Sequence, residues 1–327
     1  MRFVPTDEQQ DFARSLDAML TAAGAPAAAR AWAGGDHAPG LALWSRLAGA
    51  GVFALAAPEA YEGVGPLPVE LAVAFVELGR HAAPGPLAET VAAAALLTRL
   101  AESGDAAAAK RLLPGLATGE ATATLATADG GRYALDPDAV TTVLAVSPGA
   151  VLRIAPGHGP LHASLDPARR LAVPAAGGEV LAEGPQVAAA AAYAADVAAL
   201  VTAAQCLGVG LALLDQTVAY VRRRTQFGVA VGSFQAVKHR LADVLVGLEF
   251  ARPLLYGAAV TMAPADVAAA KATAGEAAYA AARAALQLHG AVGYTEELDL
   301  SLWLRKARPL RDAWGTPARC RARVLEG

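Results

Sequence analysis

Arginine, amide, aromatic and glycine residues gather in two segments of the C-terminal third of the sequence. The segment Arg224-Thr-Gln-Phe-Gly228 offers a permanent cation for a diphosphate, an amide for a ribose hydroxyl or adenine edge, and a flat ring. The segment Gln287-Leu-His-Gly-Ala-Val-Gly-Tyr-Thr295 adds a second amide, and its glycines at 290 and 293 let a backbone approach a ligand closely. Taken singly, each residue is more often structural, so only the ordered series favours binding of a nucleotide.

Metal and disulfide chemistry have little support in the sequence. His158 and His162 stand four residues apart, but Pro160 and the neighbouring glycines disfavour the helix that would place both rings on one face. We therefore expect no metal site. The chain has only two cysteines, Cys206 and Cys320, which excludes a disulfide scaffold and a four-cysteine zinc site and is typical of a reducing cytoplasm.

Composition excludes several classes of function. The chain has 327 residues, of which 55% are hydrophobic and 17% are charged, so it is long enough for two or three domains and is not disordered. A net charge of −3 argues against binding to nucleic acid or to an anionic membrane. The uncharged run between Asp196 and Asp215 is long enough to cross a membrane, but its alanines and polar residues favour a buried bundle helix.

Turn residues and periodicity divide the chain into three parts. We predict an N-terminal helical domain over residues 1–117, a short β-rich and antiparallel middle domain over 118–186, and a C-terminal helical bundle over 187–327. Expected helices in the first part cover 41–51, 69–81 and 87–113, the last with a break at Gly104. Expected helices in the bundle cover 187–224, 234–258, 265–290 and 296–323.

Several motifs in a fixed order resemble the acyl-CoA dehydrogenases. Besides the two segments above, these motifs are 233–243, Trp303-Leu-Arg-Lys-Ala-Arg308, 43–51, 58–65 and 76–80. The resemblance implies a mainly α fold with a small β middle domain and a C-terminal four-helix bundle. It also implies FAD as cofactor, a dimer of dimers, and desaturation of an acyl-CoA to the trans-2-enoyl-CoA. In that reaction a carboxylate removes the α-proton and the β-hydride passes to the flavin.

The resemblance also assigns cofactor-binding positions. They are Arg224, Gln226, Phe227, Gln235, Gln287, Gly290, Ala291, Gly293 and Thr316. In the family, most of these positions hold the ADP half of the FAD of a neighbouring subunit. Ala291 replaces a family glycine, which removes one position for close backbone contact.

The catalytic machinery of the family departs from its usual pattern here. Trp314 stands where the family places its glutamate, and an indole cannot accept a proton at neutral pH. The alternative position of the base, on the first bundle helix, falls at Ala198 or Ala199. The two carboxylates nearest to these positions are Asp312 and Asp196. Segments that contact the flavin ring are also missing, and the nearest match, 124–131, keeps only the hydroxyl of Thr127.

These departures suggest the degenerate subunit of an actinobacterial α2β2 acyl-CoA dehydrogenase, with a homologous catalytic partner that binds the acyl-CoA. Bulky substrates, including CoA esters of steroid side chains, are associated with such complexes. One alternative is a self-sufficient enzyme whose base is Asp312 or Asp196. Another is a non-enzymatic remnant that binds CoA esters or scaffolds a partner. In each case we expect a cytoplasmic protein without a nucleic-acid or membrane partner.

Overall fold

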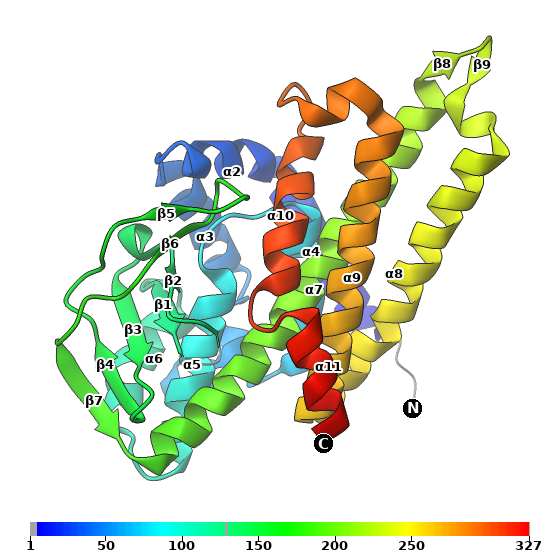
Figure 1. Cartoon of the computed structure of the whole chain (residues 1–327). Coiled ribbons are helices and arrows are strands. Elements are labelled where there is room, and N and C mark those ends of the chain that lie inside the picture. The colour runs from blue at the N-terminus through cyan, green and yellow to red at the C-terminus, as the bar shows by residue number, and fades with distance from the viewer. Residues whose placement is uncertain (1–4, 128–129, 327) are drawn as a thin grey trace.

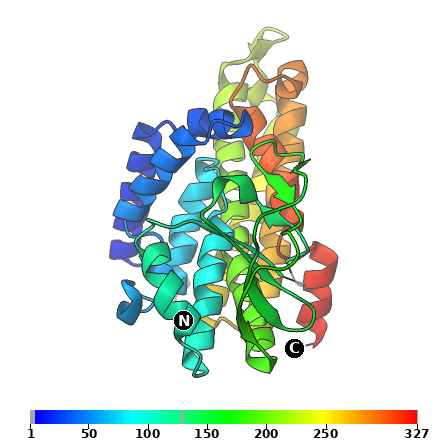
Figure 2. The ribbon, with the colours of Figure 1, turned by 90° about the vertical axis from the view of Figure 1, so that its left-hand side faces the viewer.

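The protein combines a helical bundle with a β-rich middle region that packs beside it (Figure 1). The computed structural model describes residues 5–127 and 130–326. Figure 2 looks onto the strands, with the N-terminal helices to the left and the bundle behind. Buried alanine, leucine and valine side chains from the N-terminal helices, the strands and the bundle form one continuous hydrophobic core. The fold class predicted from the sequence is confirmed.

The N-terminal part is made of helices. They are α1 (Asp7–Ala22), α2 (Ala25–Ala33), α3 (Ala38–Gly49), α4 (Pro68–Arg80), α5 (Leu87–Glu102) and α6 (Ala107–Ala117). Thr6 caps α1, since its hydroxyl accepts from the Gln9 amide while the Gln9 side chain accepts from the Thr6 amide. The break expected at Gly104 separates α5 from α6.

The middle part carries two small sheets. Their strands are β1 (Ala123–Ala126), β2 (Ala134–Leu135), β3 (Thr142–Val146), β4 (Val151–Ile154), β5 (His162–Ala163), β6 (Arg170–Ala172) and β7 (Glu179–Glu183). One sheet has the order β1-β3-β4-β7 and the other the order β2-β6-β5. The expectation of a purely antiparallel domain is wrong, because β1 pairs with β3 in parallel. The connection between β1 and β3, which contains β2, carries the chain back to the end of the sheet where β1 begins. Amino-acid composition does not predict such a crossover.

The bundle contains α7 (Pro185–Arg223), α8 (Gln235–Thr261), α9 (Pro264–His289), α10 (Leu300–Asp312) and α11 (Pro317–Glu326). Among the described residues, α7 and α8 are long and apolar enough to cross a membrane. The most apolar stretch of α7 is completely buried inside the fold, as expected for a core helix, whereas that of α8 is 39% buried. Burial of α7 on all sides explains why its sequence is apolar all round.

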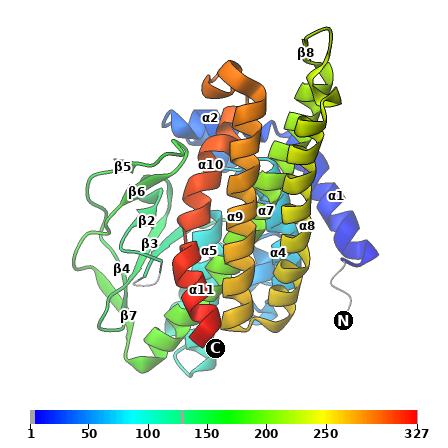
Figure 3. The same ribbon diagram turned by 45° about the vertical axis from the view of Figure 1, so that its right-hand side comes forward.

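The last predicted helix, 296–323, is two helices. Figure 3 shows α10 and α11 following one another along α9, with a short linker between them. The linker, residues 313–316, contains Trp314 at φ 53° and Gly315 at φ 133°, which are values that a helix cannot accommodate. Fully buried Lys271 of α9 stabilises the break, since its ammonium donates to the carbonyls of Leu310, Arg311 and Gly315 at 3.0, 2.8 and 3.2 Å.

Candidate functional site

A β-hairpin at one end of the bundle carries the first nucleotide-binding segment. Its strands are β8 (Thr225–Gln226) and β9 (Val229–Ala230), and it projects from the tip between α7 and α8 (Figure 1). Phe227 and Gly228 form the two-residue turn with φ of 53° and 78°. The ring of Phe227 is 91% exposed, so it presents a flat face to an incoming ligand.

The second segment lies at the same end of the bundle. The ring of Tyr220, on the last turn of α7, stacks on His289 at the end of α9 with 4.1 Å between centroids. The Tyr220 hydroxyl also donates to the His289 carbonyl at 3.4 Å. This contact brings the start of the hairpin next to η5, the short helix Gly290–Tyr294. The fold therefore gathers most of the predicted cofactor residues at one tip.

Four polar side chains predicted to contact the cofactor are exposed at this tip. Arg224, Gln226, Gln235 and Gln287 are all exposed, and none forms a side-chain hydrogen bond or ion pair with a described residue. Exposed donors that face outward suit a ligand that arrives from outside the chain. They fit the ADP half of FAD in chemical type, because Arg224 can pair with a diphosphate and the amides can bond to ribose or adenine.

The two glycines of the second segment have different roles. Gly290 has φ 63°, and a Cβ built there would meet no atom within 4 Å, so the left-handed backbone alone explains the glycine. Gly293 is buried, and its Cβ would lie 3.2 Å from the Cβ of His289. Ala291 is exposed beside them. Close packing of the turn against His289 therefore explains the glycine at 293.

Thr316 does not belong to this tip. It begins α11, where its carbonyl accepts from the Cys320 amide at 2.9 Å and its hydroxyl accepts from the Arg319 amide at 3.3 Å. Thr316 lies in the linker close to Trp314. This linker is at the part of the bundle away from the β8–β9 hairpin (Figure 1). Within this chain Thr316 therefore lies apart from the other predicted cofactor residues, and its contact with the cofactor stays a prediction.

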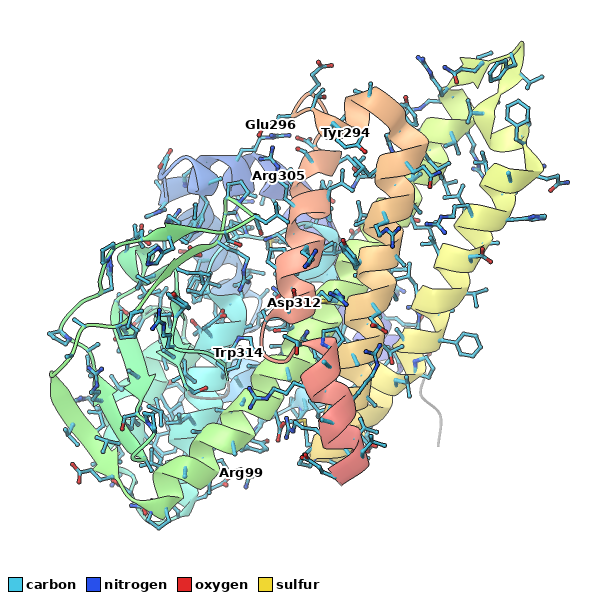
Figure 4. All side chains as sticks on the ribbon, in the orientation of Figure 1. Arg99, Tyr294, Glu296, Arg305, Asp312 and Trp314 are labelled. Carbon is cyan, nitrogen blue, oxygen red and sulfur yellow. The ribbon has the colours of Figure 1, made fainter. Side chains whose placement is uncertain are left out.

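Trp314 lines a cavity between α10, α5 and the strands. Its Nε1 donates to Oε1 of Glu89 at 3.1 Å, and its ring lies so close to Gly130 that a Cβ there would come within 2.3 Å. Glu89 lies in the first turn of α5 and is 4% exposed, so the helix dipole and the indole N–H stabilise a buried carboxylate. In Figure 4, Trp314 and Asp312 lie at the base of α10, facing the strands.

The cavity beside Trp314 has a volume of about 310 Å³. Its walls are apolar at Leu125, Leu135 and Leu171 and polar at Glu89, Ser164, Arg169, Arg308 and Asp312. Sequence reasoning did not identify Glu89, because no motif surrounds it and its partner is 225 residues away.

The two carboxylates proposed as a relocated base lie in different places. Asp312 lines the cavity, but Arg308 and Arg311 each pair with it at 3.4 Å. Asp196 is 5% exposed and pairs with Arg323 of α11 at 2.8 Å, and it does not line the cavity. Ala198 and Ala199 are buried and cannot titrate. Among the described residues, the carboxylates that line this cavity are therefore Asp312 and Glu89.

The remaining predictions concern the middle region and metals. Thr127 is buried, and its hydroxyl accepts from the Gly130 amide at 2.9 Å, so it holds a turn. Positions 128 and 129 of the segment 124–131 lie outside the described residues. In the described part of the chain, the acidic and histidine side chains close enough to share an ion are Asp17, Glu77 and His81, between α1 and α4.

Comparison with known proteins gives concordant results over nearly the whole chain. The profile of the acyl-CoA dehydrogenase N-terminal domain matches residues 6–120, and that of the C-terminal domain matches residues 188–327. The acyl-CoA dehydrogenase IpdE2 of Mycobacterium tuberculosis is 34% identical over 314 residues, which cover 93% of this chain and 92% of that protein.

Solved structures agree in fold. A variant of the Tcur3481-Tcur3483 steroid ACAD matches with a TM-score of 0.81 and 26% identity, covering 98% of this chain and 97% of that chain. The ChsE4-ChsE5 complex from Mycobacterium tuberculosis matches with a TM-score of 0.77 and 23% identity, covering 100% and 98%. Profiles, relative and fold agree, and the chain belongs to the acyl-CoA dehydrogenase family, whose members are FAD flavoproteins.

Proposed function

We propose that this chain is the non-catalytic subunit of a heteromeric acyl-CoA dehydrogenase. In this proposal Arg224, Gln226, Phe227 and Gln287 bind the ADP half of an FAD whose ring lies in a homologous catalytic partner. The partner supplies the carboxylate that takes the α-proton of the acyl-CoA, and FAD supplies the hydride acceptor. The complex is cytoplasmic and has two copies of each chain.

The observation that carries the proposal is the position of Trp314. The indole stands where the family places its base, bonds to Glu89 and packs against Gly130. A side chain held on two sides in this way leaves no proton acceptor at that position. Arg224, Gln226 and Gln287 at the other end of the bundle are exposed and have no side-chain partner among the described residues, which supports the second half of the proposal.

The relatives support a homologous partner. One similar solved structure is the ChsE4-ChsE5 complex, and another is a steroid ACAD named for Tcur3481 and Tcur3483. By analogy with that steroid ACAD, we propose a bulky acyl-CoA, such as the CoA ester of a steroid side chain, as the substrate.

Co-expression tests the proposal. The chain alone should purify without FAD and without acyl-CoA dehydrogenase activity, whereas co-expression with a homologous subunit that has the glutamate should give a yellow, active complex. Replacing Arg224 by alanine should lower FAD retention in that complex. Unchanged retention would favour a scaffold without flavin contacts, and a lone chain that holds stoichiometric FAD reducible by an acyl-CoA would contradict the proposal.

A second candidate function is a self-sufficient dehydrogenase, because Asp312 and Glu89 both line the cavity beside Trp314. Asp312→Asn and Glu89→Gln distinguish the two functions, since each change removes a proton acceptor and keeps the size of the side chain. Under our proposal the complex keeps its turnover in both variants. A loss of turnover in either variant, with the FAD content unchanged, would favour the self-sufficient enzyme.

A further inference from the structure

A groove between α9 and α10 adjoins the predicted ADP contacts and has no assigned role. It has a volume of about 330 Å³ and passes beside η5. Its walls are apolar at Leu286 and Leu304, aromatic at Tyr279 and Tyr294, and cationic at Arg283 and Arg305. Figure 4 shows Tyr294 and Arg305 near the end of the bundle, well above Asp312 and Trp314. The groove shares no lining residue with the cavity beside Trp314.

The two arginines of the groove differ in availability. Arg305 bonds to Glu296, so its charge is neutralised within the chain. Arg283 is exposed and forms no side-chain hydrogen bond or ion pair with any residue in the described ranges. A guanidinium without a partner, on the rim of an apolar groove, suits an anion attached to an apolar or aromatic group.

Tyr294 supplies a surface for such an aromatic group. Its side chain is 77% exposed although it borders the groove, so one face of the ring is available. A phenol ring can pack on a planar base and place its hydroxyl in water. Together, Arg283 and Tyr294 offer a cation and a stacking face, which are the two features that an adenosine diphosphate requires.

The groove is continuous with the proposed flavin contacts. Arg283 and Gln287 are four residues apart on α9, so their side chains are neighbours on one face of that helix. Gly293, in the turn that follows Gln287, also lines the groove. A ligand bound at Gln287 therefore lies within reach of Arg283 and of the groove.

We propose that Arg283 and Tyr294 extend the ADP-binding surface of this chain. Arg283 pairs with the diphosphate, and Tyr294 packs against the adenine. The inference rests on the proposed function, because that function places an ADP group at this end of the bundle. Both FAD and CoA contain ADP, so the chemistry is shared and experiment must separate the two sources.

Calorimetric titration of the chain with ADP tests the inference. Arg283→Gln should weaken ADP binding about tenfold, as expected for the loss of one charge-assisted contact. Tyr294→Leu should weaken it about threefold, because the stacking face is lost. Arg46→Gln is the matched control: Arg46 is an exposed arginine on α3 without a described partner, and its replacement should leave the affinity unchanged.

The outcomes separate this inference from the proposed function. If Arg283→Gln binds ADP like the unmodified chain while Arg224→Gln binds it more weakly, the inference is wrong and the proposed function stands. If Arg224→Gln also has no effect, the proposed ADP contacts fail as well. A chain that binds no ADP at millimolar concentration overturns the inference.

The complex with a catalytic partner identifies the source of the ADP group. If the group belongs to FAD, Arg283→Gln lowers the FAD content of the purified complex and leaves the KM for the acyl-CoA unchanged at saturating FAD. If it belongs to CoA, the FAD content is unchanged and the KM rises about tenfold. If neither quantity changes, the inference is contradicted.

Discussion

At the residue scale, the site depends on one pair of side chains, Trp314 and Glu89. The sequence identified Trp314 because it interrupts a motif, and it gave no sign of Glu89, which lies on a different helix. A buried carboxylate needs a donor, and the indole N–H is the donor at 3.1 Å. Under the proposed function, a glutamate at 314 would bring a second carboxylate next to Glu89, so the indole at 314 and the carboxylate at 89 are physically coupled.

This coupling predicts the behaviour of Trp314→Phe. Phenylalanine keeps most of the ring but removes the N–H, so Glu89 loses its donor and the free energy of unfolding should fall by about 1–3 kcal/mol. The double variant Trp314→Phe with Glu89→Leu should recover most of that loss, because neither polar group remains. Urea denaturation measures both changes. Equal stability of Trp314→Phe and the unmodified chain would show that the bond contributes nothing.

Thr98 offers a second test at this scale. Its Oγ1 is buried without a hydrogen-bond partner among the described residues, and it borders a cavity of about 90 Å³ between α5 and α7. Thr98→Val replaces the hydroxyl by a methyl group and should stabilise the protein by about 1 kcal/mol. Thr90→Val is the control and should destabilise it, because the Thr90 hydroxyl donates to the Ala123 carbonyl at 2.6 Å. A destabilised Thr98→Val variant would refute this account of the cavity.

At the scale of elements, the linker between α10 and α11 determines where position 314 points. Helical periodicity continues through 296–323, so the sequence predicts one helix there. The break depends on a lysine of α9, some forty residues earlier in the chain, whose ammonium binds carbonyls on both sides of it. Periodicity reports only contacts along one helix, so it cannot predict this tertiary contact.

Lys271→Met should therefore loosen the linker. Methionine fills much of the same space but leaves the carbonyls of Leu310, Arg311 and Gly315 without a donor, which should cost on the order of 3 kcal/mol. Quenching of tryptophan fluorescence by acrylamide should increase as Trp314 becomes more accessible. Lys110→Met, an exposed change on α6, serves as the control. Unchanged quenching and unchanged stability would show that Lys271 does not stabilise the linker.

The contact between α1 and α4 predicts a dependence on pH. Burial raises the pKa of Glu77 from 4.5 to about 7, with Arg80 opposing the shift and Asp17 adding to it. Between these two values the folded chain binds more protons than the unfolded chain, so the free energy of unfolding falls as the pH rises. Relative to Glu77→Gln, which cannot ionise, the unmodified chain should lose up to about 3 kcal/mol between about pH 4.5 and 7. Urea denaturation at several pH values measures the free energy of unfolding of both proteins. A difference between them that stays constant from about pH 4.5 to 7 would contradict this prediction.

At the scale of the whole molecule, the order helices, strands, bundle follows from composition and turn residues. Most of the residues predicted for the cofactor meet at one tip because the stacked rings of Tyr220 and His289 join the ends of α7 and α9. The parallel pairing of β1 with β3 and the separate place of Thr316 could not be read from the sequence. The strand pairing and the position of Thr316 both depend on how segments distant in the sequence pack together. Local sequence patterns carry no information about such packing.

The measurement that tests the account most directly is the number of FAD molecules in the assembled complex. If Trp314 closes this chain's own chamber and the tip binds the partner's cofactor, the complex should hold one FAD for each pair of unlike chains. Arg224→Ala in this chain should lower that occupancy, although the flavin ring lies in the partner. Two FAD molecules for each pair, or an occupancy that Arg224→Ala leaves unaltered, would contradict the account.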